Sequence, residues 1–181
     1  SSAFDTSMVS DGMTMTMKIT KADGSSFASC DEIATAYASA SGIRMKMTMN
    51  MDQSQHGMTM TSTYDMLFLP NLATTGYTMN MTMSMDMSMT QQGRNFSLSI
   101  DPATIVMTAA SKDATPTMDG TMTMTYMGLT VSKVKFNATG IVPSQTVDIL
   151  KEGSKVATME IDANGQAVVK DLSGAVITTQ G

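Results

Sequence analysis

Methionine alternates with small polar residues in several long runs of this sequence. The clearest run covers residues 77–90, where methionine occupies every second position from 79 to 89. Side chains point alternately to the two faces of a β-strand, so each run predicts a strand with one thioether face and one hydroxyl face. Similar runs begin near residues 13, 45, 58 and 118. We therefore expect an all-β protein in which methionine lines one face of the sheet.

The residues between the runs predict an antiparallel meander. The connections are short and contain glycine, asparagine or glutamine, as is usual for β-hairpins. We expect the third strand to end at Pro70, because proline cannot donate a hydrogen bond to a neighbouring strand. The expected strands cover residues 12–20, 43–52, 58–69, 77–90, 95–100, 104–108 and 117–136, the last of them either one long strand or a pair broken near Gly128.

One short helix is predicted at about residues 31–41. Ser29 is placed to cap its N-terminus, and Gly42 follows its last turn. Asp31 and Glu32 fall in the first turn, where the helix dipole favours acidic side chains. Helical spacing puts Ile33, Ala36, Tyr37 and Ala40 on one face. We expect this face to lie on the sheet, so that the helix covers part of it.

The composition changes after Asn137, where methionine nearly disappears and short valine and isoleucine strands begin. This change predicts two domains, a methionine-rich β-domain over residues 1–136 and a small C-terminal β-module over residues 137–181. The module is expected to be a meander of strands 147–150, 156–161 and 167–170. Asn164 and Gly165 predict a type I′ turn between its last two strands.

Charge and hydrophobicity exclude several classes of protein. Only 15% of the 181 residues are charged, against about 25% in a typical soluble domain. The net charge is −5 and the basic residues are scattered, so no nucleic-acid surface is expected. No apolar stretch reaches the roughly 20 residues of a membrane-spanning helix. Neither a Ser-His-Asp arrangement nor a phosphate-binding loop nor a zinc cluster occurs, so we expect no enzyme.

Three Asn-X-Ser/Thr sequons, at Asn80, Asn95 and Asn137, are candidate glycosylation sites. The chain also begins SSAFD without an initiator methionine, as a processed secreted chain would. Together these features predict an extracellular or cell-surface location. Cys30 is the single cysteine, and we expect it to be buried, with an intermolecular disulfide as the alternative.

Methionine sulfur also raises the question of metal binding. Thioethers are soft ligands that suit Cu(I), and alternating methionines place two sulfurs on one side of a strand. Met51, His56 and Met58 flank one predicted hairpin and form the candidate metal site. Because a binding site needs few ligands while the methionine pattern runs through many strands, we expect no cofactor, with Cu(I) as the alternative.

The longest run is the candidate strand for self-association. Within residues 77–90 the single charge is Asp86 and there is no proline, so the run lacks the features that protect an exposed strand edge. Pairing with a second copy would extend the sheet and bury methionine against methionine, as in cross-β assemblies. The expected assembly residues are Met79, Met81, Thr82, Met83, Ser84, Met85, Met87 and Met89.

Residues 137–174 resemble the small β-modules of secreted and surface proteins from methanogenic archaea, with a G-x-x-P-x-Q-x-V-x-I opening at Gly140 and a D-A-N-G turn at Asp162. The whole chain is similar in character to the amyloid-like sheath and surface-fibre proteins of those organisms. This resemblance implies a secreted structural protein whose partner is itself. The methionine-rich strands also look like those of LolA-like half-barrels, which implies a carrier of lipid or another apolar ligand as the alternative function. Cu(I) binding is the second alternative.

Overall fold

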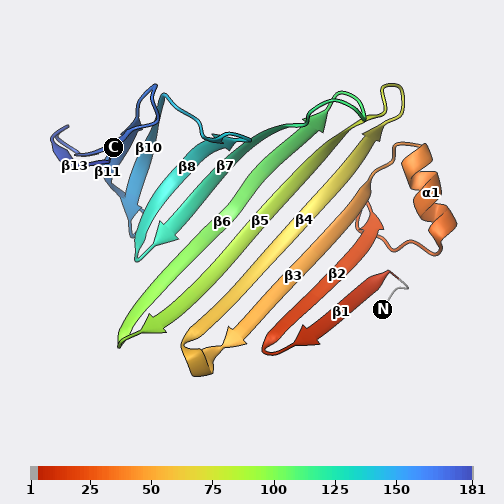
Figure 1. Cartoon of the computed structure of the whole chain (residues 1–181), viewed down its shortest axis with the longest axis horizontal. Coiled ribbons are helices and arrows are strands. Elements are labelled where there is room, and N and C mark those ends of the chain that lie inside the picture. The colour runs from red at the N-terminus through yellow and green to blue at the C-terminus, as the bar shows by residue number, and fades with distance from the viewer. Residues whose placement is uncertain (1–3, 181) are drawn as a thin grey trace.

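A computed structural model of the chain describes residues 4–180 as one open antiparallel sheet of 13 strands (Figure 1). Twelve strands lie side by side in chain order, from β1 to β8 and then from β10 to β13, and the short β9 pairs with β8 alone. The prediction of an all-β meander with one short helix is confirmed. The described strands are β1 (Asp5–Ser10), β2 (Met13–Lys21), β3 (Ile43–Gln53), β4 (Met58–Asn71), β5 (Gly76–Gln91), β6 (Arg94–Ala109), β7 (Thr117–Tyr126), β8 (Leu129–Asn137), β9 (Gly140–Ile141), β10 (Gln145–Lys151), β11 (Ser154–Ile161), β12 (Ala167–Asp171) and β13 (Val176–Gln180).

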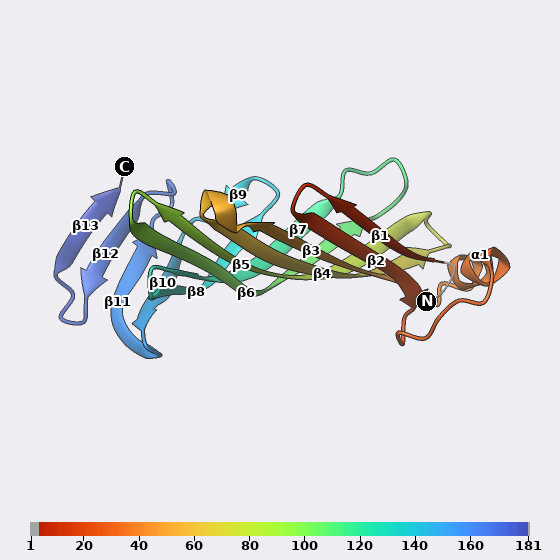
Figure 2. The same cartoon turned by 90° about the horizontal axis from the view of Figure 1, so that it is seen from below.

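The sheet is a single layer. Within the described residues no second sheet or row of helices lies over either face, and Figure 2 shows that the layer is bent rather than flat. The accessible surface is 11173 Å². A compact monomer of 19.2 kDa would expose about 8,400 Å², so this fold exposes roughly a third more. No large side chain among the described residues is fully buried.

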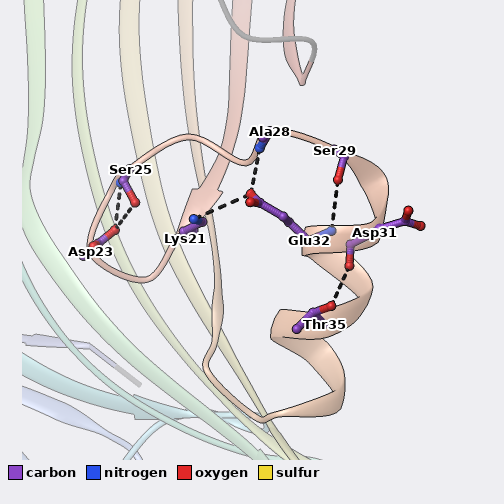
Figure 3. Close-up of polar contacts among 8 residues, drawn as sticks. All are labelled: Lys21, Asp23, Ser25, Ala28, Ser29, Asp31, Glu32 and Thr35. Carbon is purple, nitrogen blue, oxygen red and sulfur yellow. Dashed lines mark hydrogen bonds and ion pairs between the residues drawn. The ribbon is translucent and has the colours of Figure 1, made fainter.

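The helix α1 (Cys30–Ala38) lies beyond the ends of β2 and β3, so it stands at one end of the sheet and not over a face, where it was expected (Figure 1). Ser29 caps it as predicted, since its Oγ accepts a hydrogen bond from the Glu32 backbone N–H at 3.3 Å (Figure 3). The Glu32 carboxylate accepts a bond from the Ala28 N–H at 2.8 Å and lies 3.5 Å from the Lys21 ammonium. These contacts fix the start of the helix to the end of β2.

Two strand predictions were wrong in their bounds. β4 continues through Pro70 to Asn71, and Pro70 pairs with Tyr77 at the far end of the β4–β5 hairpin. Residues 95–100 and 104–108 belong to one strand, β6, because the register with β5 shifts by one residue beside Pro102 and then continues. The prediction of two separate strands here was therefore wrong.

The tight turns also differ from expectation. A type I′ turn needs positive φ at both central residues, but at residues 164 and 165 only Gly165 has one, +80°. The Asp162 carboxylate accepts the N–H groups of Asn164 and Gln166 and stabilises a different turn there. Two consecutive positive φ values occur instead at four other turns between neighbouring strands: Asp11–Gly12, Gln92–Gly93, Met127–Gly128 and Glu152–Gly153.

Three features of the sequence were missed or placed wrongly. Strands β1 and β13, which form the two edges of the sheet, were not predicted. Cys30 is exposed, so the expectation of a buried thiol was wrong; it is the first residue of α1, on a helix that lies outside the sheet. The sheet is continuous across Asn137, because β8 pairs with β10, and the division into two domains at that residue stays a prediction.

Candidate functional site

The candidate site is the face of the sheet that carries methionine, which we call the methionine face. Residues directly opposed in a strand pair share a face, so the register defines it. Met51 opposes both Met13 and Met60, and Met60 opposes Met87, which gives a row of four across β2 to β5. Every methionine in a strand lies on this face, and Met127 lies in the β7–β8 turn.

Bulges keep the methionine face apolar across the middle of the sheet. Met83 opposes Ala103 and Met85 opposes Ile100, so one residue of β5 spans two of β6. A similar shift in β8 brings Val131 and Val134 to the same face as Met124 and Met122. Without the extra residue at each bulge, the second halves of β6 and β8 would present their polar side chains on the methionine face. The bulges also increase the local twist and so contribute to the bend.

The methionine side chains shield smaller residues between them. Ser62 is 2% exposed and Ala103 0% exposed, although no second layer covers either of them. Their neighbours in the rows are Met49 and Met85 for Ser62, and Met83 for Ala103. The methionines themselves are mostly half-buried. The face is therefore a nearly continuous thioether surface that still contacts solvent.

Charged residues on the methionine face of β2 to β7 stand at strand ends, at Lys21 and Arg94. Near the helix the face ends in an aromatic cluster. Tyr37 of α1 stacks on Phe68, with ring centroids 6.2 Å apart, and Phe68 contacts Tyr77 at 5.3 Å. The Tyr77 hydroxyl lies 3.6 Å from the Met107 sulfur. The interior of the face thus offers apolar and thioether groups to a partner.

The opposite face carries hydroxyl and charged groups and holds the strongest ion pair. Both Asp65 carboxylate oxygens accept from the Arg44 guanidinium, one of them from Nε at 2.8 Å. This pair lowers the pKa of Asp65, because the hydrogen bonds and the positive charge favour the ionised carboxylate. Asn80, Asn95 and Asn137 all lie on this polar face. Their glycosylation stays a prediction, and a glycan there would leave the methionine face uncovered.

The candidate assembly strand lies in the middle of the sheet. β5 pairs with β4 along one side and with β6 along the other, so its backbone hydrogen bonds are made within the chain. Its methionines contribute to the methionine face, whereas Thr82 and Ser84 lie on the polar face. This strand can take part in association through its side chains, and the sheet edges belong to β1 and β13.

The candidate metal residues are divided between a face and a turn. Met51 and Met58 lie on the methionine face, and His56 ends the 3₁₀ turn η1 (Ser54–His56) between β3 and β4, where it is exposed. Among residues 4–180 no three His, Cys, Asp or Glu side chains gather closely enough to hold a metal ion. Metal binding by Met51, His56 and Met58 stays a prediction.

Comparison with known proteins found no matching family model, no similar curated protein and no similar solved structure. Within the described part of the chain, no helix is long and apolar enough to cross a membrane. The arguments about function therefore rest on the residues and geometry of the sheet. The bulges that join the methionine runs to the valine strands were not predicted. Pro102 could have marked the first, because proline inside an inner strand is found at bulges, whereas no residue pattern marks Ser132–Lys133.

Proposed function

We propose that this chain is a structural subunit that associates with copies of itself by burying the methionine face. The observation that carries the proposal is the uncovered apolar face of a single-layer sheet. Exposed apolar patches on soluble monomers are usually smaller than about 600 Å². The surface excess over a compact monomer is roughly 2,700 Å² per chain, or about 5,400 Å² for two chains, and obligate interfaces bury about 2,000–5,000 Å² or more in total.

A second copy fits this face in size and in chemistry. Two sheets that pack face to face form a sandwich about 10 Å thick in which side chains interdigitate. Methionine is unbranched and flexible, so two copies of the same bent face can fill the space between them. We further propose that the product is an extracellular fibre or sheath rather than a catalyst, with further growth along the edge strands β1 and β13. The low charge and the sequons on the opposite face support that location.

The association is tested by placing a charge in the centre of the face. Met83→Lys should shift the native protein from an assembly toward monomer, because the ammonium would be desolvated without a partner. Light scattering after gel filtration and negative-stain microscopy report the change. The matched control is the double variant Thr82→Lys and Ser84→Lys, whose lysines stand on the polar face of the same strand and should leave the interface intact. Monodisperse wild-type monomer at high concentration would overturn the proposal.

A second candidate function is transport of a lipid or another apolar ligand. The uncovered methionine face favours it, since an apolar surface of this kind can hold an acyl chain as well as another sheet. Mass spectrometry of an organic extract of the purified protein distinguishes the carrier from the structural subunit. A monomer that co-purifies with lipid supports the carrier, whereas an empty extract from an assembled protein supports the structural subunit.

A further inference from the structure

The methionine face is built from two different kinds of side chain. Strands β2 to β5 present mainly methionine, whereas β8 and β10 to β12 present valine and isoleucine on the same face, namely Val131, Val134, Val147, Ile149 and Val169. Both halves belong to one uncovered face. β-Branched residues are stiffer and have the higher strand propensity, so packing alone favours them. The methionine half differs from the valine half in the flexibility of its side chains, which suits packing against a second copy, and in its sulfur atoms, which are potential metal ligands.

The register places methionine residues directly opposite one another on neighbouring strands. Three consecutive opposed pairs of β2 and β3 form what we call the thioether ladder: Met13–Met51, Met15–Met49 and Met17–Met47. On the other side of β3, Met51 opposes Met60. Directly opposed side chains have Cβ atoms about 4.5–5.5 Å apart. Because methionine has three rotatable side-chain bonds, sulfurs on three adjacent strands can reach a common point.

We propose that Met13, Met51 and Met60 form a binding site for a soft monovalent metal ion, Cu(I) or Ag(I). Thioethers are neutral, soft ligands that suit such ions, and they bind hard cations such as Ca²⁺ or Mg²⁺ poorly. All three methionines are half-buried, so an ion can reach them from solvent. The ligands come from three strands of one chain, so the site forms in a monomer and does not depend on the proposed assembly. It also differs from the hairpin site, since His56 is not a ligand.

The experiment measures metal binding to the full chain under reducing conditions. Cu(I) is titrated in competition with a chromogenic chelator, and Ag(I) stoichiometry is read by native mass spectrometry. The triple variant Met13→Leu, Met51→Leu and Met60→Leu removes the three sulfurs and conserves volume. We expect it to lose the tightest-bound ion while its circular dichroism stays that of the wild type.

The matched control replaces three methionines that have no methionine directly opposite. Met122 faces Val134, Met159 faces Val147 and Val169, and Met127 lies in a turn. Changing these three to leucine should leave the tightest-bound ion in place. Equal affinity in the two triple variants would overturn the proposal, as would a wild type that cannot compete with the chelator. A loss in His56→Ala as large as in the variant of Met13, Met51 and Met60 would move the ion to the hairpin and overturn the proposed three-strand site.

A measurement on the wild-type protein tests the site even if the triple variant fails to fold. The methyl groups of methionine give separate NMR signals, and a bound ion shifts those of its own ligands. Titration with Ag(I) should move the signals of Met13, Met51 and Met60 first and leave those of Met122, Met127 and Met159 unchanged. Uniform shifts across all methionines would contradict a defined site.

Discussion

At the scale of single residues, the methionine face depends on small residues that admit their neighbours. Gly120 on β7 opposes Phe136 on β8 and Ile105 on β6. A Cβ atom at position 120 would lie 2.3 Å from the Phe136 ring, closer than real contacts permit. The ring therefore lies over the glycine and fills the space that a side chain would take.

We expect Gly120→Val to lower the free energy of unfolding by about 1–3 kcal/mol, because the Phe136 ring must leave its position. Chemical denaturation measures the loss. The control is Thr121→Val, on the opposite face of the same strand, which should change stability much less. Equal stability of Gly120→Val and wild type would mean that the ring moves without cost.

The Arg44–Asp65 pair makes stability depend on pH. The pKa of Asp65 in the folded protein lies below its ordinary value of 3.8. The pair therefore stabilises the fold above that pH, and its contribution is lost as the pH falls through the folded pKa. Asp65→Asn should cost about 1 kcal/mol at neutral pH and close to nothing in strong acid. Denaturation at several pH values checks this, with the exposed Asp86→Asn as control; a cost that does not change with pH would contradict it.

At the scale of the elements, the helix is short and depends on its cap. α1 has 9 residues, and isolated helices of that length are marginal. Ser29 and Glu32 stabilise its first turn, and Tyr37 anchors it to Phe68. We expect Ser29→Ala to destabilise the helix by about 1 kcal/mol. Ser29→Asp should preserve it, because its carboxylate accepts the same hydrogen bond.

Hydrogen exchange of the backbone amides in residues 30–38 tests whether Ser29→Ala destabilises α1. Exchange should become faster in Ser29→Ala and stay unchanged in the middle of the sheet, at β4 and β5. The sheet should be insensitive because α1 lies beyond one end of it (Figure 1). Faster exchange in β5 as well would show that helix and sheet unfold together.

At the scale of the whole molecule, the fold has a large surface and little core, so its stability comes from strand pairing and from side chains packed along one face. The long hairpins between β3 and β6 pair along 11 to 14 residues each. Apolar contacts across the rows of the methionine face add to these backbone bonds. The part of this apolar face that contacts solvent in the single chain can still be buried, and its burial would stabilise association.

Methionine oxidation should therefore dissociate the assembly. A peroxide converts each thioether into a polar sulfoxide, with reduction of the peroxide to water. Half-buried methionines of the face are accessible in the monomer and would be shielded in the assembly. We expect peroxide-treated protein to lose association in gel filtration in step with the number of oxygen atoms added by mass spectrometry. Oxidation confined to Met127, in its turn, should leave association unchanged, and full oxidation without dissociation would contradict the proposed interface.

The sequence by itself determined the class of fold, because a period of two can be satisfied only by strands. Runs such as 77–90 predicted both the strands and their methionine face, and hairpin-sized connections predicted the meander. The helix was predicted from Ser29, its acidic first turn and its spacing of apolar residues. These are local signals, so no distant contact was needed to interpret them.

The tertiary structure alone decided which strands are edges and what the methionine face contains. The run at 77–90 has the composition of an unprotected edge, yet pairing on both sides places it at the centre, because strand order depends on the whole meander. The bulges at β6 and β8 reverse the alternation, and only the register shows that valine continues the methionine face. The opposition of Met13, Met51 and Met60 has the same origin: residues far apart in sequence meet only when the strands are aligned.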